Sequence, residues 1–307
     1  MEVNRRNVLK TMGLGTLAAI QPMTTFAAPK KKGKFTYCLN TSTIRGQNPG
    51  LAKYIEIAAE AGYDGIEIWI QDLQKYLADG NSTSDLASMI KESGLKVENA
   101  IGFAPWMATD EEKSKQGFKQ MEEEMNLLAA IGCHRVAAPG IGAEAPVDLF
   151  SAGQKFKELI KLGRKTGVMP QLEFWGAFKP FHHLGQILMV AAIANDPDAR
   201  LLPDIYHLFR GGSDFEGLKL IAGNAIEIFH MNDFTANIPR EEQADKDRVY
   251  PGDGVGPLVQ VVKDLQNMGG DKVLSLELFN PEYWKQDPLL VAKTGLSKMK
   301  SIVKEAS

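Results

Sequence analysis

The sequence predicts one α/β domain in which eight parallel strands close into a (β/α)8 barrel, the TIM barrel fold. Eight short apolar runs alternate with about eight helical patterns over residues 34–307, and such alternation implies parallel pairing with right-handed crossovers. The chain has 307 residues, 44% of them hydrophobic, which is enough for one large core. An open doubly wound sheet is the alternative, but no glycine-rich phosphate-binding fingerprint follows the first strand.

Glycine and proline mark the helix boundaries in the first half of this domain. Pro49 is placed to open the first helix, Gly62 to end it, and Gly94 to end the second. The expected strands are residues 35–39, 65–69, 95–101 and 134–138, and the expected helices are 49–61, 84–93, 110–130 and 151–165.

The second half repeats the alternation with one long interruption. The expected strands are residues 169–174, 200–205, 225–231 and 272–278, and the expected helices are 183–194, 215–221, 257–267 and 288–304. Residues 234–249 form a polar insertion longer than an ordinary βα loop, and we interpret this insertion as a candidate lid.

The first 27 residues are typical of an export signal. Arg5 and Arg6 precede a mildly apolar run, residues 12–20, and small residues up to Ala27 offer a cleavage site. Paired arginines before such a run resemble a twin-arginine signal, which predicts a periplasmic protein. The run is too short to span a bilayer stably, so we expect no membrane insertion after cleavage. A disordered tail or an uncleaved anchor is the alternative. Residues 28–33 are expected to be a linker between the signal and the domain at 34–307.

Charge and cysteine content exclude two classes of function. The formal net charge is −3, from 35 basic and 38 acidic residues, and gives no basic stripe for a nucleic-acid partner. The two cysteines, Cys38 and Cys133, are too few for a cysteine-based zinc site. We expect both to be small buried residues, although their spacing leaves a disulfide open.

Four consecutive predicted strands end on side chains that bind metal ions. These are Glu173, Asp204, His230 and Glu277, at the ends of strands five to eight. The C-terminal strand ends of a (β/α)8 barrel form its active site, so the four side chains should converge. Three carboxylates and one imidazole favour one divalent ion, Mn²⁺, Mg²⁺ or Co²⁺, with Zn²⁺ as an alternative. Each residue alone could be a surface acid or a core histidine, but four coincidences favour a site.

Aromatic side chains at strand ends point to a carbohydrate. Trp69, Trp106, Trp175 and Trp284 fall at or just beyond the ends of strands two, three, five and eight. Aromatic faces stack on the C–H faces of sugar rings and exclude water, and packing between rim loops is the alternative. Glu67, in strand two, is either a ligand for a substrate hydroxyl or a salt-bridge partner at the top of the barrel.

Six short motifs give the chain a family resemblance. They are Gly62-Tyr-Asp-Gly-Ile-Glu67, Leu172-Glu173, Asp204-Ile-Tyr-His207, Phe229-His230-Met-Asn-Asp233, Pro251-Gly-Asp-Gly254 and Leu276-Glu277. With them, everything after residue 33 resembles the xylose isomerase-like TIM barrels, the superfamily of sugar (phosphate) isomerases and epimerases and of metal-dependent apurinic endonucleases. The histidine-rich nuclease branch fits poorly, because this chain has only five histidines.

The resemblance to ketose 3-epimerases implies roles for individual residues. Those matching Glu173, Asp204, His230 and Glu277 bind one divalent ion in that group, and the two glutamates move the proton. The residue matching His207 contacts the substrate. The arginine that epimerases place soon after the strand-seven histidine has no clear match, and Arg240 or Arg248 could substitute from the insertion.

We therefore expect an exported, metal-dependent sugar isomerase or epimerase. It would remove a proton next to a carbonyl through a metal-stabilised enediolate, with Glu173 and Glu277 as acid and base. The expected partner is a small carbohydrate substrate. The oligomeric state is left open, and a homo-oligomer is one possibility. One alternative is a periplasmic lyase or hydrolase of 3-keto-glycosides that uses the same metal site. Another is a carbohydrate-binding barrel without catalysis.

Overall fold

The structure is a computed structural model that describes residues 33–307. The predicted export signal, residues 1–27, and the linker up to residue 32 lie outside the described residues. Within the described part of the chain, no helix combines the length and the apolar character needed to cross a membrane.

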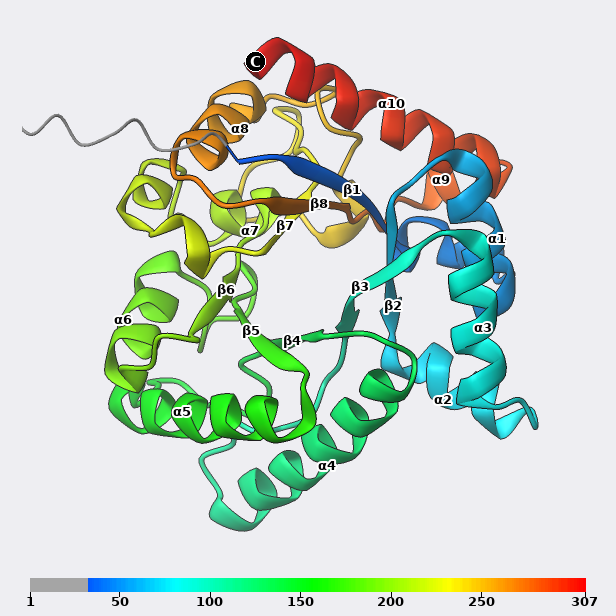
Figure 1. The fold of residues 1–307 in the computed structure, drawn as a ribbon. Helices are drawn as coiled ribbons and strands as arrows, with labels where there is room; N and C mark the ends of the chain where they lie inside the picture. The colour runs from blue at the N-terminus through cyan, green and yellow to red at the C-terminus, as the bar shows by residue number, and fades with distance from the viewer. Residues whose placement is uncertain (1–32) are drawn as a thin grey trace, which may run out of the picture. The chain divides into compact units, whose positions relative to one another are not determined.

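Eight parallel strands form the centre of the fold (Figure 1). They are β1 (Phe35–Asn40), β2 (Gly65–Trp69), β3 (Lys96–Ile101), β4 (Arg135–Pro139), β5 (Met169–Glu173), β6 (Arg200–Leu202), β7 (Ile228–Met231) and β8 (Lys272–Leu276). The hydrogen-bonded order is β3-β2-β1-β8-β7 in one sheet and β4-β5-β6 in the other. Isolated parallel bridges, including Asp204 to His230, link the β6 and β7 segments, and β3 lies beside β4. The predicted TIM barrel is confirmed.

Most of the helices surround the strands on the outside (Figure 1). They are α1 (Leu51–Ala61), α2 (Ile70–Ala78), α3 (Thr83–Ser93), α4 (Glu111–Ala130), α5 (Leu149–Thr166), α6 (Leu184–Ala194), α7 (Ile205–Arg210), α8 (Leu258–Asn267), α9 (Pro281–Trp284) and α10 (Pro288–Ala306). Short 3₁₀ turns, Thr41–Gln47, Glu216–Leu220, Gly223–Ala225 and Asp245–Asp247, complete the connections.

Three predicted elements differ from the structure. The strand predicted at residues 200–205 stops at Leu202 as β6, because Asp204 accepts the backbone N–H of His207 and caps α7. The expected helix at 215–221 is a 3₁₀ turn, and β7 begins only at Ile228. Helix α2 was not expected, because it follows β2 without a connecting loop.

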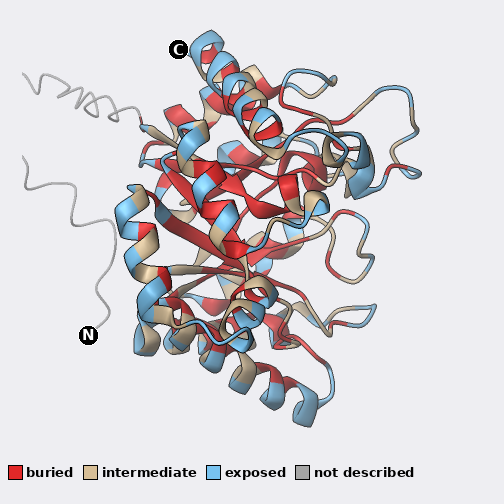
Figure 2. Ribbon diagram, turned by 90° about the vertical axis from the view of Figure 1, so that its right-hand side faces the viewer, coloured by how far each residue is buried: buried red, intermediate tan, exposed pale blue. Residues whose placement is uncertain are grey.

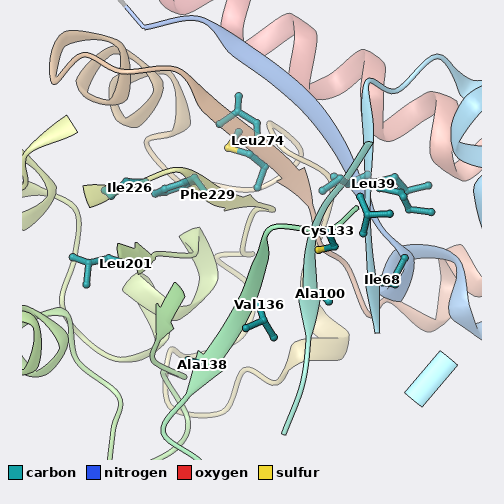
Figure 3. Close-up of a cluster of buried hydrophobic side chains, with 14 of the residues drawn as sticks. Leu39, Ile68, Ala100, Cys133, Val136, Ala138, Leu201, Ile226, Phe229 and Leu274 are labelled. Atoms are coloured by element: carbon teal, nitrogen blue, oxygen red, sulfur yellow. The ribbon is translucent and has the colours of Figure 1, made fainter. Parts of the chain in front are cut away.

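Alternation along the strands separates two apolar clusters. Leu39, Val136, Phe229 and Leu274 belong to the large core between strands and helices, part of which is drawn in Figure 3. Their neighbours in the strands, Cys38, Ala137, Ile228 and Val273, form a smaller cluster with Ile101 and Leu202. Successive strand residues face opposite sides, so this second cluster fills the inside of the barrel. Figure 2 shows the buried strands beneath partly exposed helices. Both cysteines are buried and free, as expected.

Candidate active site

A cavity of about 370 Å³ opens at the C-terminal ends of the strands. Its polar lining consists of Glu173, His207, Asp245, Arg248 and Glu277. Its apolar lining consists of Trp69, Ile101, Phe103, Trp175, Ala177, Phe178 and Phe279. The cavity therefore offers groups for charge and hydrogen bonding together with aromatic and aliphatic groups for apolar contact.

His230 lies at the meeting point of the predicted metal ligands. Its Nδ1 is 3.3 Å from Glu277 Oε2, 3.6 Å from Asp204 Oδ2 and 3.9 Å from Glu173 Oε1. Ligand atoms of Asp204, His230 and Glu277 all lie within 4.8 Å of one another. The structure thus brings together the four side chains that the sequence selected, from four neighbouring strand ends.

The donor set fits a divalent metal ion. His230 Nδ1 and Glu173 Oε2 are buried, and neither has a hydrogen-bond partner within residues 33–307. Buried polar atoms without partners are rare in folded proteins, and a bound ion is one ordinary explanation. Carboxylate oxygens with one imidazole nitrogen would hold such an ion through Glu173, Asp204, His230 and Glu277.

Glu67 holds the imidazole from its other side. The carboxylate is fully buried, and its Oε1 lies 3.0 Å from His230 Nε2. Asn40, Asn99 and Ser275 also donate to it, at 2.8, 2.7 and 2.6 Å. An acceptor at Nε2 places the proton there and leaves Nδ1 free to bind a metal. Glu67 does not line the cavity, so the substrate-ligand prediction is wrong, and its partner at the top of the barrel is His230.

Burial and the neighbouring acids shift the pKa values of Glu173 and His230. Burial, together with the neighbouring Glu277 and Asp204, raises the pKa of Glu173 to about 8, although His230 opposes the shift. Burial acts to lower the pKa of His230, but Glu277 and Glu67 raise that pKa well above its ordinary value. The cluster therefore favours cations, since its acids outnumber the positive groups that compensate them.

Arg248 is the cation that lies against these acids. Its guanidinium is buried, and Nη1 donates to Glu277 Oε2 at 2.8 Å and to Asp204 Oδ2 at 3.1 Å. Its Nη2 donates to Asp245 Oδ1 at 2.5 Å. The rings of Tyr206 and Phe279 lie 4.6 and 5.1 Å from the guanidinium carbon. Burial acts to lower the pKa of Arg248, but Asp204 and Asp245 raise it, so the side chain is charged.

Contacts at the two ends of the insertion, residues 234–249, position Arg248 beside the predicted metal ligands. Asp233, three residues after His230, forms an antiparallel bridge with Val249 and closes residues 234–248 into a loop. The Asp233 carboxylate also accepts the backbone N–H groups of Phe234, Gly252, Gly254 and Gly256. The Pro251–Gly254 motif is therefore a backbone cradle that fixes the end of the insertion, and Asp245 and Arg248 reach the cavity from it.

His207, which the family resemblance marks as a substrate contact, also lines the cavity. Its Nδ1 lies 3.2 Å from the backbone N–H of Gly176, and its Nε2 lies 3.2 Å from Arg248 Nη2. A neutral imidazole has one acceptor nitrogen, so only one of these donors can bond to it at a time. Burial lowers the pKa of His207, which keeps the ring neutral and leaves a polar edge for a substrate oxygen.

Comparison with known proteins places this geometry in a family. The family model described as xylose isomerase-like TIM barrel matches residues 55–302. The chain belongs to this family. An inosose isomerase of Bacillus velezensis is 30% identical over 87% of this chain and 96% of its own length. Relatives that carry this name support an isomerase or epimerase enzyme.

Solved structures agree with the family. An IolI protein with a bound zinc atom superposes with a TM-score of 0.82 at 27% identity, covering 89% of this chain and 99% of that one. An L-ribulose 3-epimerase superposes with a TM-score of 0.69 at 16% identity, covering 88% and 95%. At that identity, the second likeness shows the fold alone.

Two of the four tryptophans line the cavity of this xylose isomerase-like barrel. Trp69 and Trp175 flank Phe103, with ring centroids 5.3 and 5.9 Å from it. Trp106 is fully buried in the core and donates to the carbonyl of Pro139, so its substrate-binding prediction is wrong.

Trp284 also lies away from the cavity lining. It belongs to α9, and its indole packs against Gly46 and donates to the carbonyl of Ser42 at 3.1 Å. Its substrate-binding prediction is wrong as well. A strand-end position in the sequence cannot tell whether the loop carries the ring over the barrel mouth or outward over a helix.

Several site residues were missed by sequence reasoning. Asn40 is the last residue of β1 and donates hydrogen bonds to both Glu67 and Glu277. A search for polar side chains at the ends of all eight strands could have found it. Asn232, which donates to Asp204 Oδ2 at 2.9 Å, lies within a motif already singled out. Asp245 gave no signal, because only the folded insertion brings it to the cavity.

Proposed function

We propose that this xylose isomerase-like protein uses one divalent metal ion to isomerise or epimerise a small polyhydroxy ketone or sugar. The observation that supports it most is the convergence of Glu173, Asp204 and Glu277 on His230 Nδ1, with two of these acids open to the cavity. The inosose isomerase relative and the zinc-bound IolI structure agree with this proposal. Which divalent ion serves here is left to experiment.

The reaction would move a proton between carbons through the two cavity acids. One of Glu173 and Glu277 takes the proton from the carbon next to a carbonyl, and the other returns one. The bound ion would supply stabilisation of the negative charge that develops on the substrate oxygens. His207 and Arg248 would orient those oxygens, because both present polar edges to the cavity.

The lining favours a neutral substrate with an apolar ring face. Among the described cavity residues, Arg248 is the one cationic side chain, and three carboxylates already engage it. A phosphate group would therefore meet acids on one side and aromatic rings on the other. The rings of Trp69, Phe103 and Trp175 suit the C–H face of a sugar or cyclic polyol.

The test is solvent isotope exchange by the full chain. Metal-loaded protein is incubated with ketoses, aldoses and inososes in D₂O, and carbon-bound deuterium is followed by NMR, with chelator-treated protein as the control. We expect deuterium next to the carbonyl only in the loaded sample. Release of an aglycone from a 3-keto-glycoside, without exchange in free sugars, would select the lyase reading instead. Sugar binding that survives chelation, with no turnover, would select the binding barrel.

The aromatic wall is the reason to keep the lyase as second candidate. Phe178 extends the row beyond Trp175, with ring centroids 6.4 Å apart, and Phe279 extends it beyond Trp69 at 6.0 Å. A row of five rings offers more apolar surface than the two reacting carbons of a sugar require. The aglycone of a glycoside would occupy it.

We also propose that the chain is exported by the twin-arginine route. Arg5 and Arg6 before the mild apolar run support this. Replacing both with lysine should leave the unprocessed precursor in the cytoplasm of a host that has the pathway, as cell fractionation would reveal. Normal processing of that variant would contradict the proposal.

A further inference from the structure

We infer that Arg248 is a built-in counter-charge that weakens metal binding at the centre. The inference rests on the proposed metal site and adds a role to the arginine beyond contact with substrate. Its Nη1 donates to Glu277 Oε2 and Asp204 Oδ2, the same two atoms that lie nearest to His230 Nδ1. A metal ion bound by these atoms would therefore lie next to a buried positive charge.

The buried position makes this repulsion strong. The side chain of Arg248 is 1% exposed, and the side chains of Asp204 and Glu277 are 1% and 6% exposed. Little water can screen two cations in such surroundings. The guanidinium also withdraws electron density from the two oxygens, which makes them poorer ligands.

The ligands do not depend on Arg248 for their orientation. Asp204 also accepts the backbone N–H of His207 at 2.8 Å and the side-chain amide of Asn232 at 2.9 Å. Glu277 also accepts from Asn40 Nδ2 at 3.1 Å. Loss of the guanidinium should therefore remove a charge and leave the ligands in place.

Asp245 balances the arginine from the cavity side. Its Oδ1 accepts from Arg248 Nη2 at 2.5 Å and from Nε at 3.1 Å. Its side chain is 56% exposed, so this acid is the accessible member of the ion-pair chain. The affinity for metal is then set by a chain of alternating charges, from Asp245 through Arg248 to the ligands.

The test measures metal affinity and not turnover. Full-length protein is stripped with a chelator and titrated with Mn²⁺ and Zn²⁺ by calorimetry. We expect Arg248→Met to bind about tenfold or more tightly than the wild type, because it keeps the aliphatic stem and removes the charge. Arg248→Lys should stay within about threefold of the wild type, because it keeps the charge. Arg240→Gln is the matched control, since Arg240 belongs to the same insertion but pairs with Asp214 at the surface.

A second variant keeps the inference testable if Arg248→Met fails to fold. Asp245→Asn should bind metal more weakly, because the charge of Arg248 is then less compensated. Unchanged or weaker binding by folded Arg248→Met, or unchanged or tighter binding by Asp245→Asn, would overturn the inference. Absence of binding in the wild type and in every variant would instead overturn the proposed metal site.

Discussion

Glu277 offers the sharpest test of the two-acid mechanism. Glutamine is nearly isosteric with glutamate, but its amide cannot take up a proton. In the wild type, Arg248 Nη1 donates to Glu277 Oε2 at 2.8 Å, and in Glu277→Gln the amide oxygen can take the place of Oε2. The amide nitrogen would then take the place of Oε1, which accepts from Asn40 Nδ2 at 3.1 Å in the wild type, so two donors would face each other. The substitution therefore removes the base and leaves one buried donor without an acceptor.

Two magnitudes follow from that geometry. A buried donor left unpaired costs about 1–3 kcal/mol of stability, so the folded protein should survive with a lower Tm. Loss of a positioned acid or base should lower kcat by about 10²–10⁴, or about 3–5 kcal/mol in the barrier. Deuterium exchange at saturating metal measures the rate, and thermal unfolding measures the stability.

A surface glutamate provides the control for Glu277. Glu282→Gln changes an exposed residue of α9 that pairs with Lys285 outside the cavity, and it should change neither rate nor Tm noticeably. A Glu277→Gln protein with near-normal exchange at saturating metal would refute the reasoning, since Glu277 would then be at most a ligand.

Other substitutions separate metal binding from stability. Asp204→Asn should act mainly through weaker metal affinity, and excess metal in the exchange assay should partly restore its rate. Glu67→Gln should weaken metal binding by about 10–100-fold in calorimetry, because it disturbs the hydrogen bond that fixes the tautomer of His230. Burial opposes ionisation of Glu227, but hydrogen bonds from Arg200 and Arg135 lower its pKa. Its ion pairs therefore stabilise the fold above the ordinary value of 4.5 and are lost as the pH falls further below it, so Glu227→Gln should flatten the pH dependence of Tm in that acidic range. An unaltered acid profile would contradict this last prediction.

The sequence alone predicted the barrel and a cluster of metal-binding side chains at its mouth. Strand–helix alternation is local information, since period and boundary residues reveal each element without knowledge of its neighbours. Parallel strands in a closed barrel must end on the same side, so Glu173, Asp204, His230 and Glu277 could be brought together by topology alone. The predicted metal centre follows from that one rule, and the distances to His230 Nδ1 agree with it.

Only the tertiary structure decided how that centre is surrounded. Side chains alternate between the two faces of β2, and this alternation points Glu67 to the inside of the barrel. There its carboxylate contacts His230 and does not reach the cavity. Loop paths separated Trp69 and Trp175, which line the cavity, from Trp106, which became core. Arg248 reaches Asp204 across 44 residues of sequence, because Asp233 closes the insertion at its base. Such contacts depend on long-range packing, which leaves no periodic signal in the chain.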